Sequence, residues 1–281
     1  IDLVITHTVA LPSGALAATL AGKSHVWYIH EYGDIDHNFK FNFGKSFTLS
    51  LINRLSDKII VNSKALFRHY QAHFRADKLY KVYYAVQYPL FAPMLHKPKD
   101  TLSISMVGRI AAGKNQLIAL MALAVLKEKN IFPSITFIGS IDNTYLDTLQ
   151  AFSRQYNLDN QIAYIGQTSL PWKYIEQSHC VLVCSKNEAF GRVTVEAMKA
   201  GKIAVISSSG AGAELVEHEK TGYLFDPEDA VALAVILEKL WNMTDTADMT
   251  QQAHVFAHTH FNEEIHTHAI MDLISNIKLR S

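Results

Sequence analysis

The stretch "CSKNEAFGRVTVEAMKAG" (residues 184–201) decides how the fold of this chain is read. It continues the apolar run "CVLVCS" (180–185), which predicts a buried strand, and then takes on helical spacing. Glu188 and Glu196 therefore lie on either side of a strand-to-helix turn. Gly191 at this turn lets a ligand approach the backbone closely, and the free amides of a first helical turn suit a phosphate. The stretch predicts a ligand site.

The same alternation of short apolar runs and helical patterns continues along the whole chain. Nearly continuous apolar strands separated by helices are typical of parallel sheets that are buried on both faces. The sequence therefore predicts an α/β fold with two doubly wound, Rossmann-like domains. The expected strands are residues 2–6, 25–30, 57–63, 80–86, 102–108, 134–140, 162–166, 180–185, 203–209 and 222–225.

A segment with three prolines and no periodicity, "QYPLFAPMLHKPKD" (87–100), predicts a linker between the domains. We expect the first domain over residues 1–94 and the second over 95–261, facing each other across a cleft. A helix at about 262–281 is expected to pack back on the first domain. Because the first domain has four expected strands and the second has six, we expect that the first lacks its opening β-α-β units.

Composition excludes several classes of protein. Lys+Arg and Asp+Glu balance at 26 each, which argues against a nucleic-acid partner. No apolar run approaches the roughly 20 residues that span a bilayer. Cys180 and Cys184 lie in one expected strand about 13 Å apart, beyond the roughly 7 Å limit of a disulfide. Reduced thiols suit a cytoplasmic protein.

The charged residues around the strand ends describe the ligand more closely. Neither Glu188 nor Glu196 suits a phosphate, because like charges repel, so both are expected to accept hydrogen bonds from hydroxyl groups. A phosphate between two hydroxyl-rich groups describes a nucleotide-sugar. Arg109 directly follows an expected strand, and Lys114 lies at the next helix start. Together these two cations can neutralise a diphosphate without a metal ion.

These motifs carry a resemblance to a known family. "GR…GKNQ" within residues 106–116, "E-AFGRVTV-E" (188–196) and the segment that follows to residue 225 resemble the C-terminal domain of family 4 retaining glycosyltransferases of the GT-B fold. The likeness covers nearly the whole chain and is strongest over residues 101–240. The family's glycine-rich first loop, which helps to hold the acceptor, has no counterpart in this sequence.

The resemblance implies roles for individual residues. Arg109 and Lys114 would bind the donor diphosphate and stabilise the leaving nucleotide, Glu196 would bind the ribose, and Glu188 the hydroxyls of the transferred sugar. Attack on the face that the nucleotide leaves would retain the anomeric configuration, with Glu188 not acting as a covalent nucleophile. No cofactor and no metal are implied. The same pocket would be lined by Ala189, Phe190, Gly191 and Arg192.

The family also places a histidine at the end of a strand in its first domain, near the reacting sugar, and His30 in "WYIHEYG" matches that position. A histidine there can also be a structural hydrogen-bonding residue. The loop expected to contact the base is "GQTSLPWK" (166–173).

Three further patterns have a plain and a functional interpretation. Asp34 and Asp36 in "YGDIDHN" form a metal-binding type of triplet, but such triplets are common in turns. The aromatic and basic residues of 38–58 suit a peripheral membrane contact or, as we favour, a helix and loop that cover the first sheet. His254 and His258 share a helical face, which a metal site could use, but a solvated helix that packs back on the first domain is the favoured interpretation.

The sequence therefore predicts a retaining, metal-independent glycosyltransferase that moves a hexose or N-acetylhexosamine from a nucleotide-diphospho-sugar, with a UDP-sugar favoured over a GDP-sugar. A glycan or lipid-linked acceptor in surface polysaccharide synthesis is expected, reached from the cytoplasm with a possible contact at the membrane surface. Two alternatives stay open. One is a donor-binding subunit that needs a partner for activity, and the other is a GT-B sugar-nucleotide epimerase.

Overall fold

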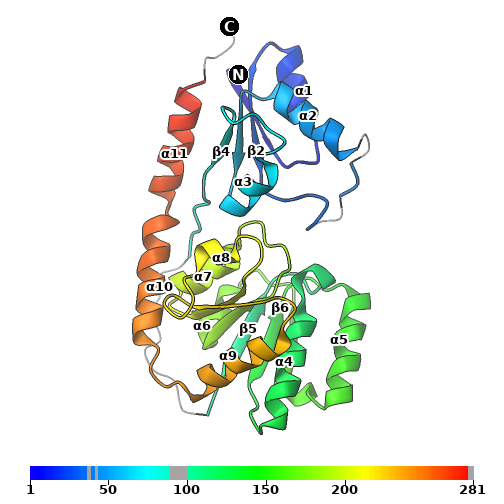
Figure 1. The fold of residues 1–281 in the computed structure, drawn as a ribbon, viewed down its shortest axis with the longest axis vertical. Coiled ribbons are helices and arrows are strands. Elements are labelled where there is room, and N and C mark those ends of the chain that lie inside the picture. Colours follow the sequence, from blue (N-terminus) through cyan, green and yellow to red (C-terminus); the bar gives the residue numbers. More distant parts are fainter. Residues whose placement is uncertain (37–38, 42–43, 89–99, 278–281) are drawn as a thin grey trace. The chain divides into compact units, whose positions relative to one another are not determined.

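The computed structural model describes residues 1–36, 39–41, 44–88 and 100–277 (Figure 1). The predicted domain boundary at residues 94 and 95 lies outside the described residues. The chain forms two compact units. The first unit comprises Ile1–Ala85, Asn187–Phe190 and Phe261–Ser281, and the second comprises Val86–Lys186 and Gly191–His260.

The first unit contains a four-stranded parallel sheet whose strands follow one another in chain order. All four strands expected from the sequence are present, and the α/β prediction is confirmed. The last strand is shorter than expected because its ladder ends where its partner strand ends, at Val61. The strands are β1 (Leu3–His7), β2 (Ser24–Ile29), β3 (Lys58–Val61) and β4 (Leu79–Lys81).

Helices cover both faces of this first sheet. Trp27 and Ile29 point into a core with α1 (Ser13–Leu20), α2 (Lys45–Leu55) and α3 (Lys64–Tyr70). Val26 and Tyr28, on the opposite face, pack against α11 (Glu263–Ser275). The strand alternation thus provides two apolar faces, as a buried parallel sheet requires.

The second unit contains a six-stranded parallel sheet in the order β10-β9-β8-β5-β6-β7. From β5 the chain runs outward to β6 and β7, then returns to β8 on the other side of β5 and continues to β9 and β10. The strand order therefore reverses between β5 and β8. The strands are β5 (Ser103–Val107), β6 (Ser134–Ile138), β7 (Ile162–Gly166), β8 (Cys180–Val183), β9 (Ile203–Ser207) and β10 (Tyr223–Phe225).

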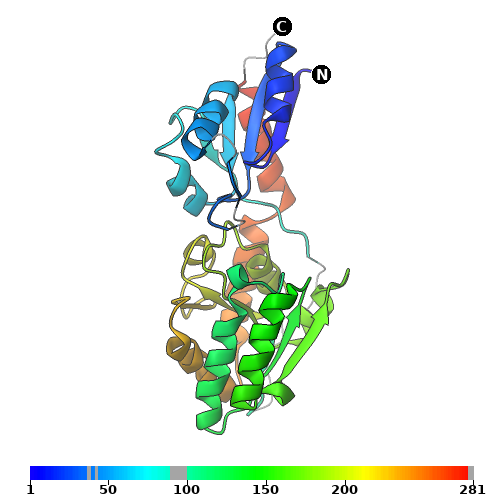
Figure 2. The ribbon, with the colours of Figure 1, turned by 90° about the vertical axis from the view of Figure 1, so that its right-hand side faces the viewer.

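The reversal assigns the connecting helices to opposite faces of the second sheet. One face carries α4 (Gln116–Glu128) and α5 (Asn143–Tyr156), with α9 (Ala230–Asn242) packed beside α4 (Figure 2). The other face carries α6 (Trp172–Gln177) and α7 (Arg192–Lys199). Two short 3-10 turns, Ala112–Lys114 and Asp159–Gln161, and the one-turn helix α8 (Gly212–Leu215) complete the connections.

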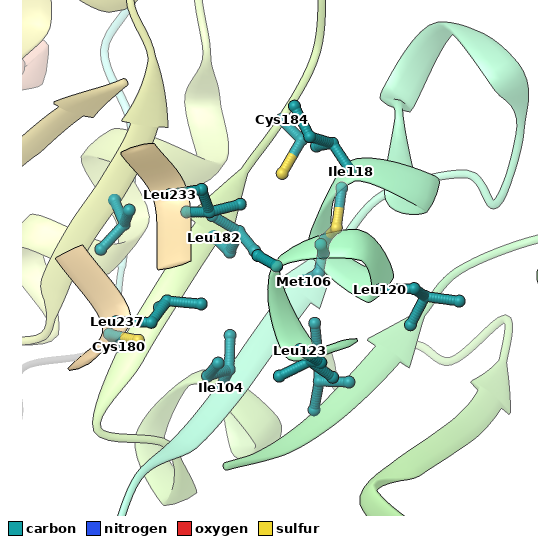
Figure 3. Packing of buried hydrophobic residues seen from close by; sticks show 14 of the residues in the cluster. Ile104, Met106, Ile118, Leu120, Leu123, Cys180, Leu182, Cys184, Leu233 and Leu237 are labelled. Carbon is teal, nitrogen blue, oxygen red and sulfur yellow. The ribbon is translucent and has the colours of Figure 1, made fainter. Parts of the chain in front are cut away.

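The core of the second unit lies between the sheet and the helices α4 and α9. Figure 3 shows side chains of β5 and β8 packed against those of α4 and α9. Cys180 and Cys184 are both buried and free within it, so the expectation of unpaired thiols is confirmed, and burial raises the pKa of the Cys184 thiol. The packed residues include Ile104, Met106, Ile118, Leu123, Leu182, Leu233 and Leu237.

The histidine-rich tail differs from its expected form. It is divided between α10 (Ala247–His260) and α11, because the side chain of Asn262 accepts a hydrogen bond from the amide of Ile265 and so begins a new helix. α10 belongs to the second unit, where His254 Nδ1 lies 2.9 Å from the carbonyl oxygen of Lys199. The tail is thus two helices that belong to different units.

The aromatic segment of residues 38–58 mostly covers the first core, as favoured. Phe39 and Phe41 are partly buried against it, while Phe47 on α2 is 57 % exposed. Phe43 lies outside the described residues. Among the residues that the structure describes, no helix is long and apolar enough to cross a membrane.

A glycine fixes the spacing of two strand ends in the second unit, which yields a first test. Gly139 has a φ of +150°, and a Cβ there would lie 2.1 Å from the carbonyl oxygen of Gly108. We expect Gly139→Ala to lower the free energy of unfolding by about 3 kcal/mol, through strain and a clash with rigid backbone. Gly113→Ala is the matched control, because nothing lies within 4 Å of its added methyl group. Equal urea midpoints for the two variants would contradict this.

Candidate active site

The point where the strand order reverses positions two of the sequence motifs. Arg109 lies in the loop after β5, and Gly191 begins the helix connection after the neighbouring strand β8. In open parallel sheets, ligands bind in the crevice at the carboxyl ends of the strands where the order reverses. Both motifs of the second unit therefore lie where this architecture binds ligands.

The loop after β5 has a fixed backbone and an exposed cation. The carbonyl oxygen of Arg109 accepts a hydrogen bond from Gln116 Nε2 at 2.9 Å. The Arg109 side chain is 66 % exposed, and its Nη2 lies 4.0 Å from Asp142 Oδ2, a long ion pair that solvent screens. The guanidinium can therefore turn towards an anion with little loss of existing contacts.

Lys114 approaches the same strand end from the following turn. It closes the 3-10 turn before α4, and the next residue, Asn115, is left-handed with a φ of 56°. Asn115 Nδ2 donates to the carbonyl oxygen of Pro227 at 2.9 Å, which fixes this turn. The Cδ and Cε atoms of Lys114 lie 3.9 Å from the position of a Cβ at Gly108. The lysine stem therefore runs back along the end of β5, close to Arg109 in sequence and in space.

The helix after β8 offers free amides and one half-buried carboxylate. Gly191 precedes it with a φ of 92°. The amide of Thr194 donates to the carbonyl oxygen of Gly191 at 3.0 Å, whereas the amides of Arg192 and Val193 at the helix start have no carbonyl partner within the helix. Glu196 lies in the second turn, where its side chain is 17 % exposed and Oε1 is 3.7 Å from Arg192 Nη2. Burial raises the pKa of Glu196, and the Arg192 guanidinium offsets only part of this effect. A carboxylate held in this way is suited to accept hydrogen bonds from a ligand.

The rest of the glutamate motif belongs to the first unit. Three of its residues belong to the first unit although they are continuous in sequence with the start of α7, namely Glu188, Ala189 and Phe190. Phe190 is buried, with its ring centroid 5.2 Å from that of Tyr84 and 5.8 Å from that of Phe261. This aromatic packing draws the loop to the first unit. Glu188 is half-buried at its start.

His30 directly follows β2 in the first unit and is half-buried. Its Nε2 lies 2.9 Å from His7 Nδ1, and its Nδ1 makes a short hydrogen bond with the hydroxyl of Tyr84. Burial and the neighbouring His7 lower the pKa of His30 to about 4. The imidazole is therefore neutral near pH 7 and acts through hydrogen bonds rather than as a cation.

Two residues beside these motifs were missed in the sequence. Tyr88 lies in the segment read as a linker, and its hydroxyl donates to the carbonyl oxygen of Trp172 at 3.3 Å, in the expected base loop. Burial and the carboxylate of Glu196 raise the pKa of Tyr88, so it also lies near the α7 site. No sequence signal identified Tyr88. His7 could have been found, because it is the last residue of β1 and so stands at a strand end, as His30 does directly after β2.

The Asp34–Asp36 triplet has the turn form that the sequence favoured. Asp36 accepts hydrogen bonds from the amides of Tyr32 and Gly33, at 2.9 and 2.8 Å, and Asp34 pairs with Lys45 at 2.9 Å. In the described part of the chain, no group of three or more His, Cys, Asp or Glu side chains could hold a metal ion.

The two parallel sheets and their helices match the fold of solved glycosyltransferases of the GT-B type. The structure resembles that of the HepE protein of Anabaena in complex with UDP and glucose, with a TM-score of 0.82 at 23 % identity, covering 98 % of this chain and 78 % of that one. A glycosyltransferase from Rickettsia africae gives a TM-score of 0.82 at 20 % identity, over 99 % and 78 % of the two chains. These likenesses concern the fold.

The chain belongs to the glycosyl transferases group 1 family, whose model matches residues 91–263, more than half of the chain. It is 28 % identical over 192 residues to the amylovoran biosynthesis glycosyltransferase AmsK of Erwinia amylovora, covering 65 % of this chain and 46 % of AmsK. It is 25 % identical over 158 residues to the capsular polysaccharide glycosyltransferase CapH of Staphylococcus aureus, covering 56 % and 42 %. The chain thus spans less than half the length of these two relatives.

The half-buried Glu196 gives a test that depends on pH. Because its folded-state pKa is raised, the folded chain binds this proton more tightly than the unfolded chain, so ionisation destabilises the fold as pH rises through that window. We expect Glu196→Gln to raise the free energy of unfolding by about 1 kcal/mol at pH 8. The gain should shrink as pH falls towards the ordinary glutamate pKa. Thermal unfolding from pH 4 to 8 measures this, and a gain that does not vary with pH would refute the argument.

Proposed function

We propose that this chain acts as a retaining glycosyltransferase of the family 4 type. It transfers a hexose or N-acetylhexosamine from a nucleotide-diphospho-sugar to a glycan or lipid-linked acceptor. The observation that carries the proposal is the position of Arg109, Lys114 and the start of α7 at the carboxyl ends of the neighbouring strands β5 and β8. Two cations and a set of free amides at one strand-order reversal are the groups that a diphosphate needs.

Each group of the second unit has a chemical task in this proposal. Negative charge grows on the departing phosphate as the bond to the sugar breaks, and Arg109 and Lys114 stabilise that charge. The amides of Gly191 and Arg192 bind the diphosphate at the helix start. Glu196 accepts hydrogen bonds from the ribose hydroxyls, because its carboxylate is largely desolvated and the Arg192 guanidinium offsets only part of that effect on its pKa.

The loop of the first unit contributes the sugar side of the donor site. Glu188 accepts hydrogen bonds from hydroxyls of the transferred sugar, and the backbone of Ala189 and Phe190 lines the same pocket. The buried ring of Phe190 supports this, because its packing against Tyr84 and Phe261 holds the loop in one conformation. The acceptor attacks the face that the nucleotide leaves, which retains the anomeric configuration.

The similar proteins motivate the proposed donor and acceptor classes. A UDP-sugar is the proposed donor, because the similar HepE fold is solved with UDP and glucose. The uracil is proposed to contact the loop of residues 166–173, which Tyr88 braces through Trp172. An acceptor in surface polysaccharide synthesis is proposed from the names of AmsK and CapH. The proposal places the enzyme in the cytoplasm, at the membrane surface. The reaction as proposed uses no cofactor and no metal ion.

Nucleotide-dependent unfolding tests the donor site. A nucleotide at a hundredfold excess over its Kd should add about 2.7 kcal/mol to the unfolding free energy. We expect UDP, rather than GDP or ADP, to raise the melting temperature of the wild type by several degrees. Arg109→Ala and Glu196→Ala should remove most of that shift. Glu217→Ala, which removes an exposed carboxylate of the same unit, should leave it intact.

Transfer is then measured with UDP-glucose and UDP-N-acetylglucosamine on polysaccharide and lipid-linked acceptors, and the anomer of the product is assigned by NMR. An α-linked product from these α-donors is expected. Absence of any nucleotide shift in the wild type would overturn the proposed donor site.

A further inference from the structure

Residues 86–88 of the second unit are attached to two of its helices. Val86 is buried, and its carbonyl oxygen accepts a hydrogen bond at 2.7 Å from Nζ of Lys199, the last residue of α7. Two residues later, the hydroxyl of Tyr88 donates at 3.3 Å to the carbonyl oxygen of Trp172, the first residue of α6. The segment therefore runs from the end of α7 to the start of α6 and is bonded at both places.

The attachment at Val86 is firm because Lys199 is buried. The lysine is 5 % exposed, so its ammonium group has lost most of its contact with water and needs protein acceptors in its place. A hydrogen bond from a charged donor is shorter and stronger than one from a neutral donor. The segment is thus held in position before it reaches Tyr88.

Tyr88 also lies near Glu196 of α7. Glu196 comes three residues before Lys199, so the two side chains lie on the same face of the helix. Burial and then the Glu196 carboxylate raise the pKa of the half-buried Tyr88, which places the two groups near each other. One aromatic side chain is therefore close to the carboxylate of α7 and bonded to the start of α6.

The loop before α6 lies at the edge of the second sheet. It follows β7, which is the last strand in the order of that sheet and has β6 as its neighbour. Within the loop, the amide of Leu170 donates to the Thr168 hydroxyl at 3.1 Å, and Leu170 is exposed. An exposed loop with few buried contacts opens at low cost in free energy. The bond from Tyr88 fixes the point at which this loop enters α6.

We propose that Tyr88 is a positioning residue for the nucleoside part of the donor, and that it acts through Trp172 on the loop of residues 166–173. The inference rests on the proposed function and deepens it, because that function assigns the base to this loop and the ribose to Glu196. Tyr88 lies near the ribose contact and is bonded to the loop that contacts the base. It therefore holds the two nucleoside contacts at a fixed separation.

The positioning role separates two parts of the ligand. The diphosphate is assigned to Arg109, Lys114 and the amides at the start of α7, and the turn that carries Lys114 is fixed by another bond, from Asn115 to Pro227. Loss of the Tyr88 hydroxyl should therefore weaken binding of the nucleoside and leave binding of the diphosphate unchanged. A general structural role would weaken both parts or neither.

Tyr88→Phe removes the hydroxyl and keeps the ring. We expect the Kd of UDP to rise about fivefold, which corresponds to the loss of one hydrogen bond of about 1 kcal/mol. The Kd of inorganic pyrophosphate should stay at its wild-type value. Titration calorimetry on the full chain, at one salt concentration, measures both constants. Tyr156→Phe is the matched control, because Tyr156 is an exposed tyrosine on α5 of the same unit, and both of its Kd values should equal those of the wild type.

A variant of the diphosphate contacts should show a different pattern. Arg109→Ala should weaken pyrophosphate and UDP alike, because both carry the two phosphates. In transfer assays with a UDP-sugar, Tyr88→Phe should raise KM about fivefold and leave kcat within about twofold of the wild type, because a nucleoside contact is the same in the ground state and the transition state. A fall in kcat at unchanged KM would contradict the positioning role.

The outcomes distinguish this inference from the proposed function. If UDP binds Tyr88→Phe and the wild type with the same Kd, or if pyrophosphate is weakened as much as UDP, the role of Tyr88 is wrong and the proposed donor site stands. If the wild type binds neither UDP nor pyrophosphate, the proposed function fails and this inference fails with it.

Discussion

The structure depends on one constraint of parallel sheets, which is that every strand must be reached by a crossover that covers a face. In the second unit the chain leaves β5 in one direction and returns to β8 beside it, so helices go to both faces and the strand order reverses between these two strands. That reversal opens the carboxyl ends of β5 and β8 to a ligand. Arg109, Lys114 and the first amides of α7 lie at these strand ends because they directly follow β5 and β8 in the chain.

The first unit has the same kind of parallel sheet, but its polar groups are brought together in a different way. Its strands follow in chain order without a reversal among the described strands, and its polar groups are gathered at the strand ends by side-chain bonds. Buried Glu31 ties the end of β1 to the end of β2, and His30 joins His7 to Tyr84. Burial keeps His30 neutral, so this end of the sheet offers hydrogen bonds rather than charge.

Most of the architecture could be predicted from the sequence. All ten expected strands are present. A strand of a parallel sheet that is buried on both faces needs a nearly continuous apolar run, and such runs can be recognised in the sequence. Ser63 caps α3, with its hydroxyl accepting a hydrogen bond from the amide of Leu66 at 3.0 Å, and serine is a residue type that helix starts favour. The division of residues 184–201 could not be predicted. Local spacing places Glu188 and Glu196 in one motif, but the packing of Phe190 against residues far away in the sequence assigns Glu188 to the first unit.

The sequence by itself determined the class of fold and which residues stand at strand ends, since apolar periodicity and helix signals act over a few neighbours and can be read locally. Only the tertiary structure decided that His30 has both nitrogens engaged and that His7 is the exposed one, because those bonds join segments 23 and 54 residues apart. It also decided that burial raises the pKa of Glu196 and lowers that of His30. Desolvation is set by everything that packs around a group, and no local pattern records it.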